Sequence, residues 1–180
     1  MNFSTEQISL KRTKALSNEI AETFTELINL ISSFDQGQVN IIPFQGSWTA
    51  GQLARHLIKA NSGFVQVLNG PAMDSKRRID EKVETIKTDF LNFGFKVESA
   101  PFIAPSKPTY EREELLNALE KIKADLIKAI DLLDLTKICL AFELPVYGFL
   151  TRLEAVYFVL YHTQRHVHQL KNIHQKVFSR

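Results

Sequence analysis

The spacing of hydrophobic residues predicts a chain made mainly of amphipathic helices. Four segments repeat apolar positions at intervals of three and four residues, which is the period of an α-helix with one buried face. The predicted helices span residues 5–34, 49–69, 109–134 and 151–176. Each has one apolar stripe that another element must cover, so we expect an all-α four-helix bundle that forms a single domain over residues 1–180.

Local signals indicate where these helices begin and end. Thr49 followed by Gln52 matches the capping box that opens many helices, and it marks the start of the second helix. Gly37 is expected to end the first helix in a left-handed cap. Pro108 and Thr109 precede the third helix, and we expect them to supply its cap.

The connections differ in length and character. Nearly forty residues, 71–108, separate the second and third helices, and a connection of this length usually contains structure. Val83, Ile86 and Phe90 indicate a short helix within it. Such a crossover allows the second and third helices to run parallel. The apolar segment 136–150 is interpreted as an ordered loop or a short pair of strands.

Charge and composition argue against several classes of partner. The chain has 22 basic and 20 acidic residues, a net charge of +2, and no dense basic run typical of nucleic-acid binding. The cluster Lys76-Arg77-Arg78 is flanked by acidic residues, so we expect a solvated surface patch. No apolar run approaches the roughly 20 residues that span a bilayer, and we expect no membrane association.

The cysteine content and the first residues indicate an intracellular setting. Cys139 has no cysteine partner in the chain, and its apolar neighbours predict an inert buried thiol. The N-terminal sequence lacks a basic region followed by an apolar stretch, so it does not resemble a secretory signal. We therefore expect a cytoplasmic protein.

Three of the five histidines lie close together in the fourth predicted helix. His162 and His166 are four residues apart, and both fall within its apolar stripe. His168 falls on the opposite side, together with Gln164 and Glu154, so we expect these three side chains to face outward. The helix therefore directs two imidazoles into the bundle.

Buried imidazoles need partners because their desolvation is costly. A metal ion satisfies both members of a pair at i and i+4, and hydrogen bonds to tyrosine or backbone groups are the alternative. His56 lies at the edge of the buried face of the second helix. Its position fits either a third ligand or a histidine bonded to a neighbouring helix.

Other catalytic patterns are missing from the sequence. No glutamate precedes a histidine by three residues, as di-iron bundles require, and Thr163 stands where a zinc protease has glutamate. The seven glycines are dispersed and form no phosphate-binding loop. Residue types alone leave serine hydrolase chemistry open, but no nucleophile-elbow pattern occurs.

Two segments resemble a known family. Ile42–Leu57, with its Trp-Thr start and a histidine two turns later, is similar to the opening of the second helix in the DinB/YfiT-like superfamily. Leu144–Gln169, with its HxxxH pair, resembles the fourth helix of that family. The resemblance implies a four-helix bundle with a long crossover between helices two and three. It also implies that His56, His162 and His166 bind one divalent metal.

For function, the resemblance implies a metalloenzyme with a small-molecule substrate. Nickel and zinc are the usual metals of the family, and a low-molecular-weight thiol is one candidate cofactor. Its characterised members transfer thiols to small molecules, isomerise them, or hydrolyse small substrates. The alternative is a non-catalytic metal-binding bundle with a stress-response or interaction role. The oligomeric state stays open, with a homodimer as one alternative.

Overall fold

Four long helices form the body of the molecule, and their predicted number and order are confirmed. The computed structural model describes residues 5–94 and 100–179. The long helices are α1 (Thr5–Ser32), α2 (Ala50–Asn69), α4 (Arg112–Leu132) and α5 (Arg152–Phe178). The shorter helical elements are η1 (Gln38–Asn40), α3 (Val83–Leu91) and η2 (Pro101–Ile103).

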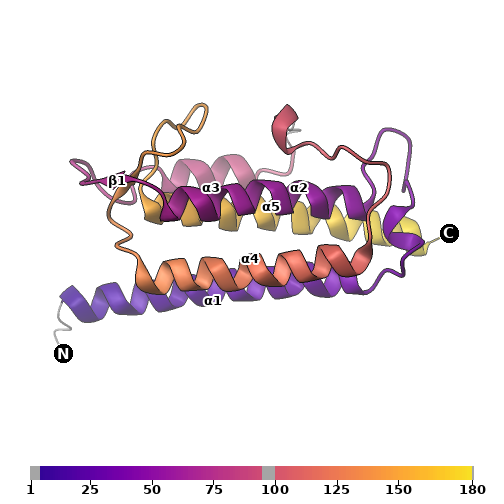
Figure 1. Ribbon diagram of the computed structural model, residues 1–180, viewed down its shortest axis with the longest axis horizontal. Helices are drawn as coiled ribbons and strands as arrows, with labels where there is room; N and C mark the ends of the chain where they lie inside the picture. Colours follow the sequence, from indigo (N-terminus) through magenta and orange to yellow (C-terminus); the bar gives the residue numbers. More distant parts are fainter. Residues whose placement is uncertain (1–4, 95–99, 180) are drawn as a thin grey trace.

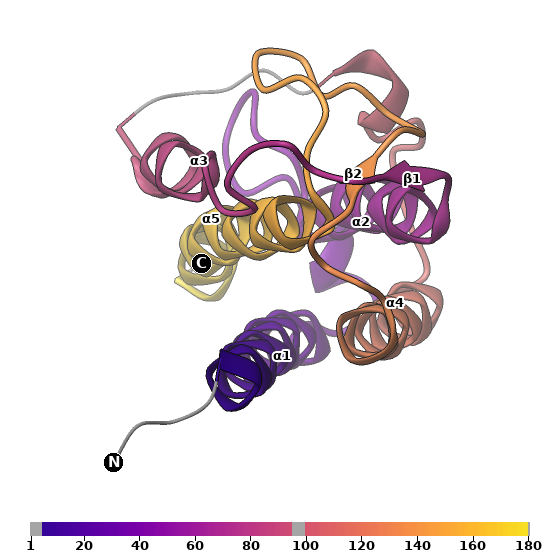
Figure 2. The same cartoon turned by 90° about the vertical axis from the view of Figure 1, so that its left-hand side faces the viewer.

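The long helices are arranged as two layers of two. Helices α1 and α4 form one layer, and α2 and α5 form the other, with α3 on the outer side of α5 (Figures 1 and 2). Helices α2 and α4 run in the same direction, as the long crossover allows, whereas α2 and α5 run antiparallel (Figure 1). The predicted bundle with a long crossover is therefore the observed fold.

One hydrophobic core joins the layers. Leu53 of α2, Leu119 of α4 and Val159 of α5 are fully buried in the same cluster. Helix α1 contributes its predicted stripe, whose buried members are Leu16, Ile20, Phe24, Leu27 and Ile31. The 3.6-residue pattern therefore identified the faces that meet.

Truncation of a central core side chain should be costly. Leu126 is completely buried, and Phe64 is 8% exposed and stacks on Phe158 with ring centroids 4.6 Å apart. We expect Leu126→Ala or Phe64→Ala to lower the free energy of unfolding by about 2–5 kcal/mol, because each leaves a cavity. Chemical denaturation measures this loss. A midpoint close to that of the parent protein would show that the substituted residue is not in the core.

Several predicted boundaries need correction. Helix α1 ends at Ser32, and Gly37 is not a left-handed cap because its φ is −72° and it precedes η1. Helix α4 begins after Glu111, which makes no side-chain cap, so Pro108 and Thr109 do not cap it. Helix ends depend on local hydrogen bonds that a hydrophobic period does not report.

Capping boxes open both helices of the second layer. The Thr49 hydroxyl accepts from the backbone amide of Gln52, and the Gln52 side-chain oxygen accepts from the backbone amide of Thr49, as predicted. Thr151 and Glu154 form the same reciprocal pair at the start of α5. The second box has the same Thr-x-x-acid/amide pattern, so the sequence contained a signal for the start of α5 as well.

The crossover includes the predicted short helix and half of a small sheet. The strands β1 (Ala72–Met73) and β2 (Ile138–Cys139) pair antiparallel, with Ala72 opposite Cys139. The segment 136–150 therefore contains a strand, but its partner precedes α3. Burial raises the pKa of the Cys139 thiol to about 11, which agrees with the inert thiol expected there.

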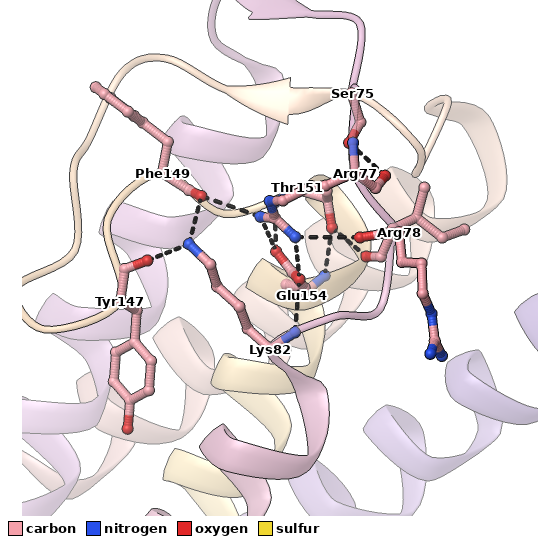
Figure 3. A network of polar contacts seen from close by, with 9 residues as sticks. Ser75, Arg77, Arg78, Lys82, Tyr147, Phe149, Thr151 and Glu154 are labelled. Carbon is pink, nitrogen blue, oxygen red and sulfur yellow. Dashed lines mark hydrogen bonds and ion pairs between the residues drawn. The ribbon is translucent and has the colours of Figure 1, made fainter.

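A buried ion pair anchors the crossover to α5, which corrects two predictions (Figure 3). Glu154 is completely buried, not outward, and both of its carboxylate oxygens accept from Arg77 at 2.6 Å. The backbone amide of Lys82 also donates to Glu154, at 2.9 Å. Arg77 is therefore not part of a solvated patch, although its neighbours Lys76 and Arg78 are exposed.

Across the described residues, no helix combines the length and the apolar character that a membrane span requires.

Candidate metal centre

Helices α2 and α5 bring three histidines to one point. His56 lies in the second turn of α2, and His162 and His166 lie one turn apart near the middle of α5. Because these helices are antiparallel neighbours, the face of α2 that carries His56 meets the middle of α5. His56 is 2% exposed and His162 is 7% exposed, so His56 is buried more deeply than its predicted position at the edge of the face.

The three rings converge at their Nε2 atoms. The Nε2 atom of His56 lies 3.3 Å from that of His162 and 3.2 Å from that of His166. The Nε2 atoms of His162 and His166 are 3.1 Å apart. The predicted convergence of the three imidazoles is therefore confirmed, and the described residues add no cysteine, carboxylate or further histidine to the group.

Two of the rings are oriented through their other nitrogen. The Nδ1 atom of His56 lies 3.2 Å from the Ile103 carbonyl, and Nδ1 of His166 lies 2.9 Å from the Gln169 amide oxygen. A carbonyl oxygen only accepts, so in the neutral rings both Nδ1 atoms carry the hydrogen and both Nε2 atoms present lone pairs. For His162, the buried Nδ1 atom has no partner among the described residues.

Hydrogen bonds among the rings cannot satisfy this arrangement. Each Nε2 of a neutral imidazole presents either a hydrogen or a lone pair. With three such nitrogens close together, at least two must both present a hydrogen or both present a lone pair. Here the lone pairs of His56 and His166 face each other at 3.2 Å. A cation relieves this repulsion because it accepts all three lone pairs.

The spacing of the nitrogens also fits an ion. Three nitrogens at the Zn–N distance of about 2.0–2.1 Å from a tetrahedral ion lie about 3.3–3.4 Å apart. The observed separations of 3.1, 3.2 and 3.3 Å are close to this value. The three-histidine group could therefore hold a divalent metal ion.

The electrostatic environment keeps the rings neutral. Burial is the main reason that the pKa of each of the three histidines lies below the ordinary value. The ammonium of Lys59 lowers the pKa of His56 further, and Arg165 acts in the same direction on His162 and His166. Neutral imidazole is the form that binds metals, so the site is ready to bind an ion at neutral pH.

Aromatic side chains enclose the group. The Trp48 ring lies 5.2 Å from that of His56, and the rings of Phe90 and Phe158 each lie 5.7 Å from that of His162. An apolar wall excludes water and strengthens electrostatic interactions inside it.

Three other polar side chains of α5 lie outside the group. His168 is exposed, as predicted, and stacks on Phe93 with ring centroids 4.1 Å apart. Gln164 was expected outside but is half-buried, with its amide 3.4 Å from the Thr23 hydroxyl. Arg165 is also half-buried and donates to backbone carbonyls at the end of α3. Neighbouring helices therefore cover more of α5 than the apolar stripe indicated.

Sequence reasoning missed the groups that orient the ligands. Gln169 follows His166 by three residues, which places both side chains on the same face of α5. That spacing was a usable signal. The Ile103 carbonyl gave no signal in the sequence, because every residue type has the same backbone carbonyl.

Comparison with known protein families places the chain in a superfamily. A family model described as the DinB superfamily matches residues 19–170, most of the chain, including both helices that carry the histidines. No curated protein and no solved structure matches the chain. The match agrees with the resemblance inferred from the two histidine segments.

Proposed function

This chain belongs to the DinB superfamily, and on that premise we propose that it is a metal-dependent enzyme. His56, His162 and His166 would hold one divalent ion, with nickel and zinc as the candidates. The reaction would be thiol transfer to a small electrophile, or hydrolysis of a small substrate.

One observation carries the metal part of the proposal. The Nε2 atoms of His56 and His166 face each other at 3.2 Å inside the protein, and a shared cation makes this arrangement favourable because it accepts both lone pairs. The enzymatic part rests on the donor set. Three protein ligands without a fourth are typical of catalytic sites, whereas structural zinc sites are closed by four.

His56, His162 and His166 would hold the divalent ion, which would supply Lewis-acid activation of a water or thiol at neutral pH. The protein residues would position this chemistry. The Ile103 carbonyl orients the ring of His56, and the Gln169 side chain orients that of His166. Trp48, Phe90 and Phe158 would supply apolar walls for a small substrate.

The experiment combines metal analysis with a substrate screen. The purified protein, loaded with zinc or nickel, is assayed with small thiols plus electrophiles and with small esters and amides. We expect one ion per chain, and turnover that is lost on chelation and restored by the metal. If the purified protein bound no metal under these conditions, the proposed metal site would be refuted.

Metal binding without turnover would favour the non-catalytic alternative. A purely structural ion predicts that chelation unfolds the bundle, because binding energy is then folding energy. The enzyme predicts that the chelated protein keeps its helical circular dichroism and loses activity. The two measurements separate the proposals.

A further inference from the structure

The segment that orients His56 is attached to the bundle mainly by polar contacts. Residues 100–110, here called the strap, contain η2 (Pro101–Ile103), and no residue of η2 is fully buried. Hydrophobic burial therefore does little to fix the Ile103 carbonyl. Its position depends on the hydrogen bonds that hold the strap.

Three side chains on one face of α2 bind the strap backbone. Gln52 donates to the Lys107 carbonyl at 3.3 Å, His56 to Ile103 at 3.2 Å, and Lys59 to Ala104 at 2.7 Å. The donors are spaced at i, i+4 and i+7, so they follow one stripe of the helix. The proposed metal ligand is the middle member of this row.

The far end of the strap has its own anchor. The Tyr110 hydroxyl accepts from the backbone amides of Ser106 and Lys107, at 3.0 and 2.9 Å. The Tyr110 amide donates to the Asn40 side chain at 2.8 Å. These bonds do not reach Ile103, whose neighbour Ala104 is held by Lys59.

We propose that Lys59 is a positioning residue of the metal centre, which holds the Ile103 carbonyl against His56 by binding the next carbonyl along the strap. The inference rests on the proposed metal site. The bond from Lys59 is charge-assisted and the shortest of the three, so it contributes most to fixing the strap. The fixed carbonyl keeps hydrogen on Nδ1 of His56 and leaves Nε2 for the ion.

A simple charge argument predicts the opposite sign. The ammonium of Lys59 repels a divalent ion, so its removal should tighten metal binding if charge were its only effect. Positioning predicts weaker binding, because loss of a partner that orients a ligand costs roughly 10–100-fold in metal affinity. The sign of the change therefore decides between the two roles.

The test measures zinc affinity of the full chain by competition with a chromophoric chelator. We expect Lys59→Met to weaken binding on the order of 10–100-fold, and Lys59→Arg, which keeps a charged donor, to stay within about threefold of the parent. Lys121→Met is the matched control, since Lys121 is exposed on α4 in the other layer and pairs with Asp125. The Lys121→Met substitution should leave the zinc affinity unchanged.

Hydrogen exchange gives an independent readout. In Lys59→Met without metal, the amides of Ile103 and Ala104 should exchange faster, while those of α2 keep their protection. Equal or tighter zinc binding by Lys59→Met, or unchanged exchange in the strap, would overturn the inference while leaving the metal site intact. If the parent chain bound no zinc, the proposed function would fail first.

Discussion

Replacing any one of His56, His162 or His166 by alanine is expected to reduce zinc affinity by more than the roughly 10–100-fold that loss of an outer hydrogen-bond partner costs. Each ring supplies one of three nitrogens that lie within 3.3 Å of one another, so each loss leaves only two ligands. Calorimetric titration with zinc measures the effect.

His168→Ala is the matched control for this experiment. His168 lies on the same helix as two of the triad histidines but is exposed. The His168→Ala variant should bind zinc with the same affinity as the parent protein. If this variant lost the metal while His162→Ala kept it, the site would have to lie elsewhere on the helix.

Replacing Arg77 by methionine is expected to lower the free energy of unfolding by about 3–5 kcal/mol, because the change leaves a buried charge without its partner. The Glu154 carboxylate is completely buried and takes two bonds of 2.6 Å from this one guanidinium (Figure 3). Urea denaturation at neutral pH measures the loss.

The neighbouring arginine offers a control. The Arg78 side chain is 80% exposed and pairs with Asp80, so Arg78→Met should change stability by less than about 0.5 kcal/mol. Adding Glu154→Gln to Arg77→Met removes the unpaired charge and should recover part of the loss. If Arg77→Met and Arg78→Met lowered the free energy of unfolding equally, the buried pair would contribute no more than an exposed one.

The same pair predicts a dependence on pH. Burial alone would raise the pKa of Glu154, but hydrogen bonds from Arg77, Thr151 and Lys82 outweigh it and the pKa is lowered. A lowered folded pKa contributes stability above the ordinary glutamate pKa, about 4.3, and this stability is lost as the pH falls through the folded value. Without Arg77 that contribution disappears, so the parent and Arg77→Met should converge on acidification.

The sequence by itself determined the bundle and placed His162 and His166 on its inner face, and its resemblance to the family added His56. Hydrophobic residues at a period near 3.6 define one buried face per helix, and His162 and His166 fall on that face because four residues nearly complete a turn. The capping box at Thr49 fixed the start of α2 through bonds between residues three apart. Signals of this kind are local, so they can be read from one segment of chain.

The tertiary structure alone decided which groups surround those elements. Glu154 was placed outward by its helical angle, but the crossover brings Arg77 and the Lys82 amide over the start of α5 and buries it. The Ile103 carbonyl reaches His56 from 47 residues away along the chain. Such contacts join segments whose approach is set by packing of the whole bundle, and a periodic pattern within one helix contains no information about what covers its ends.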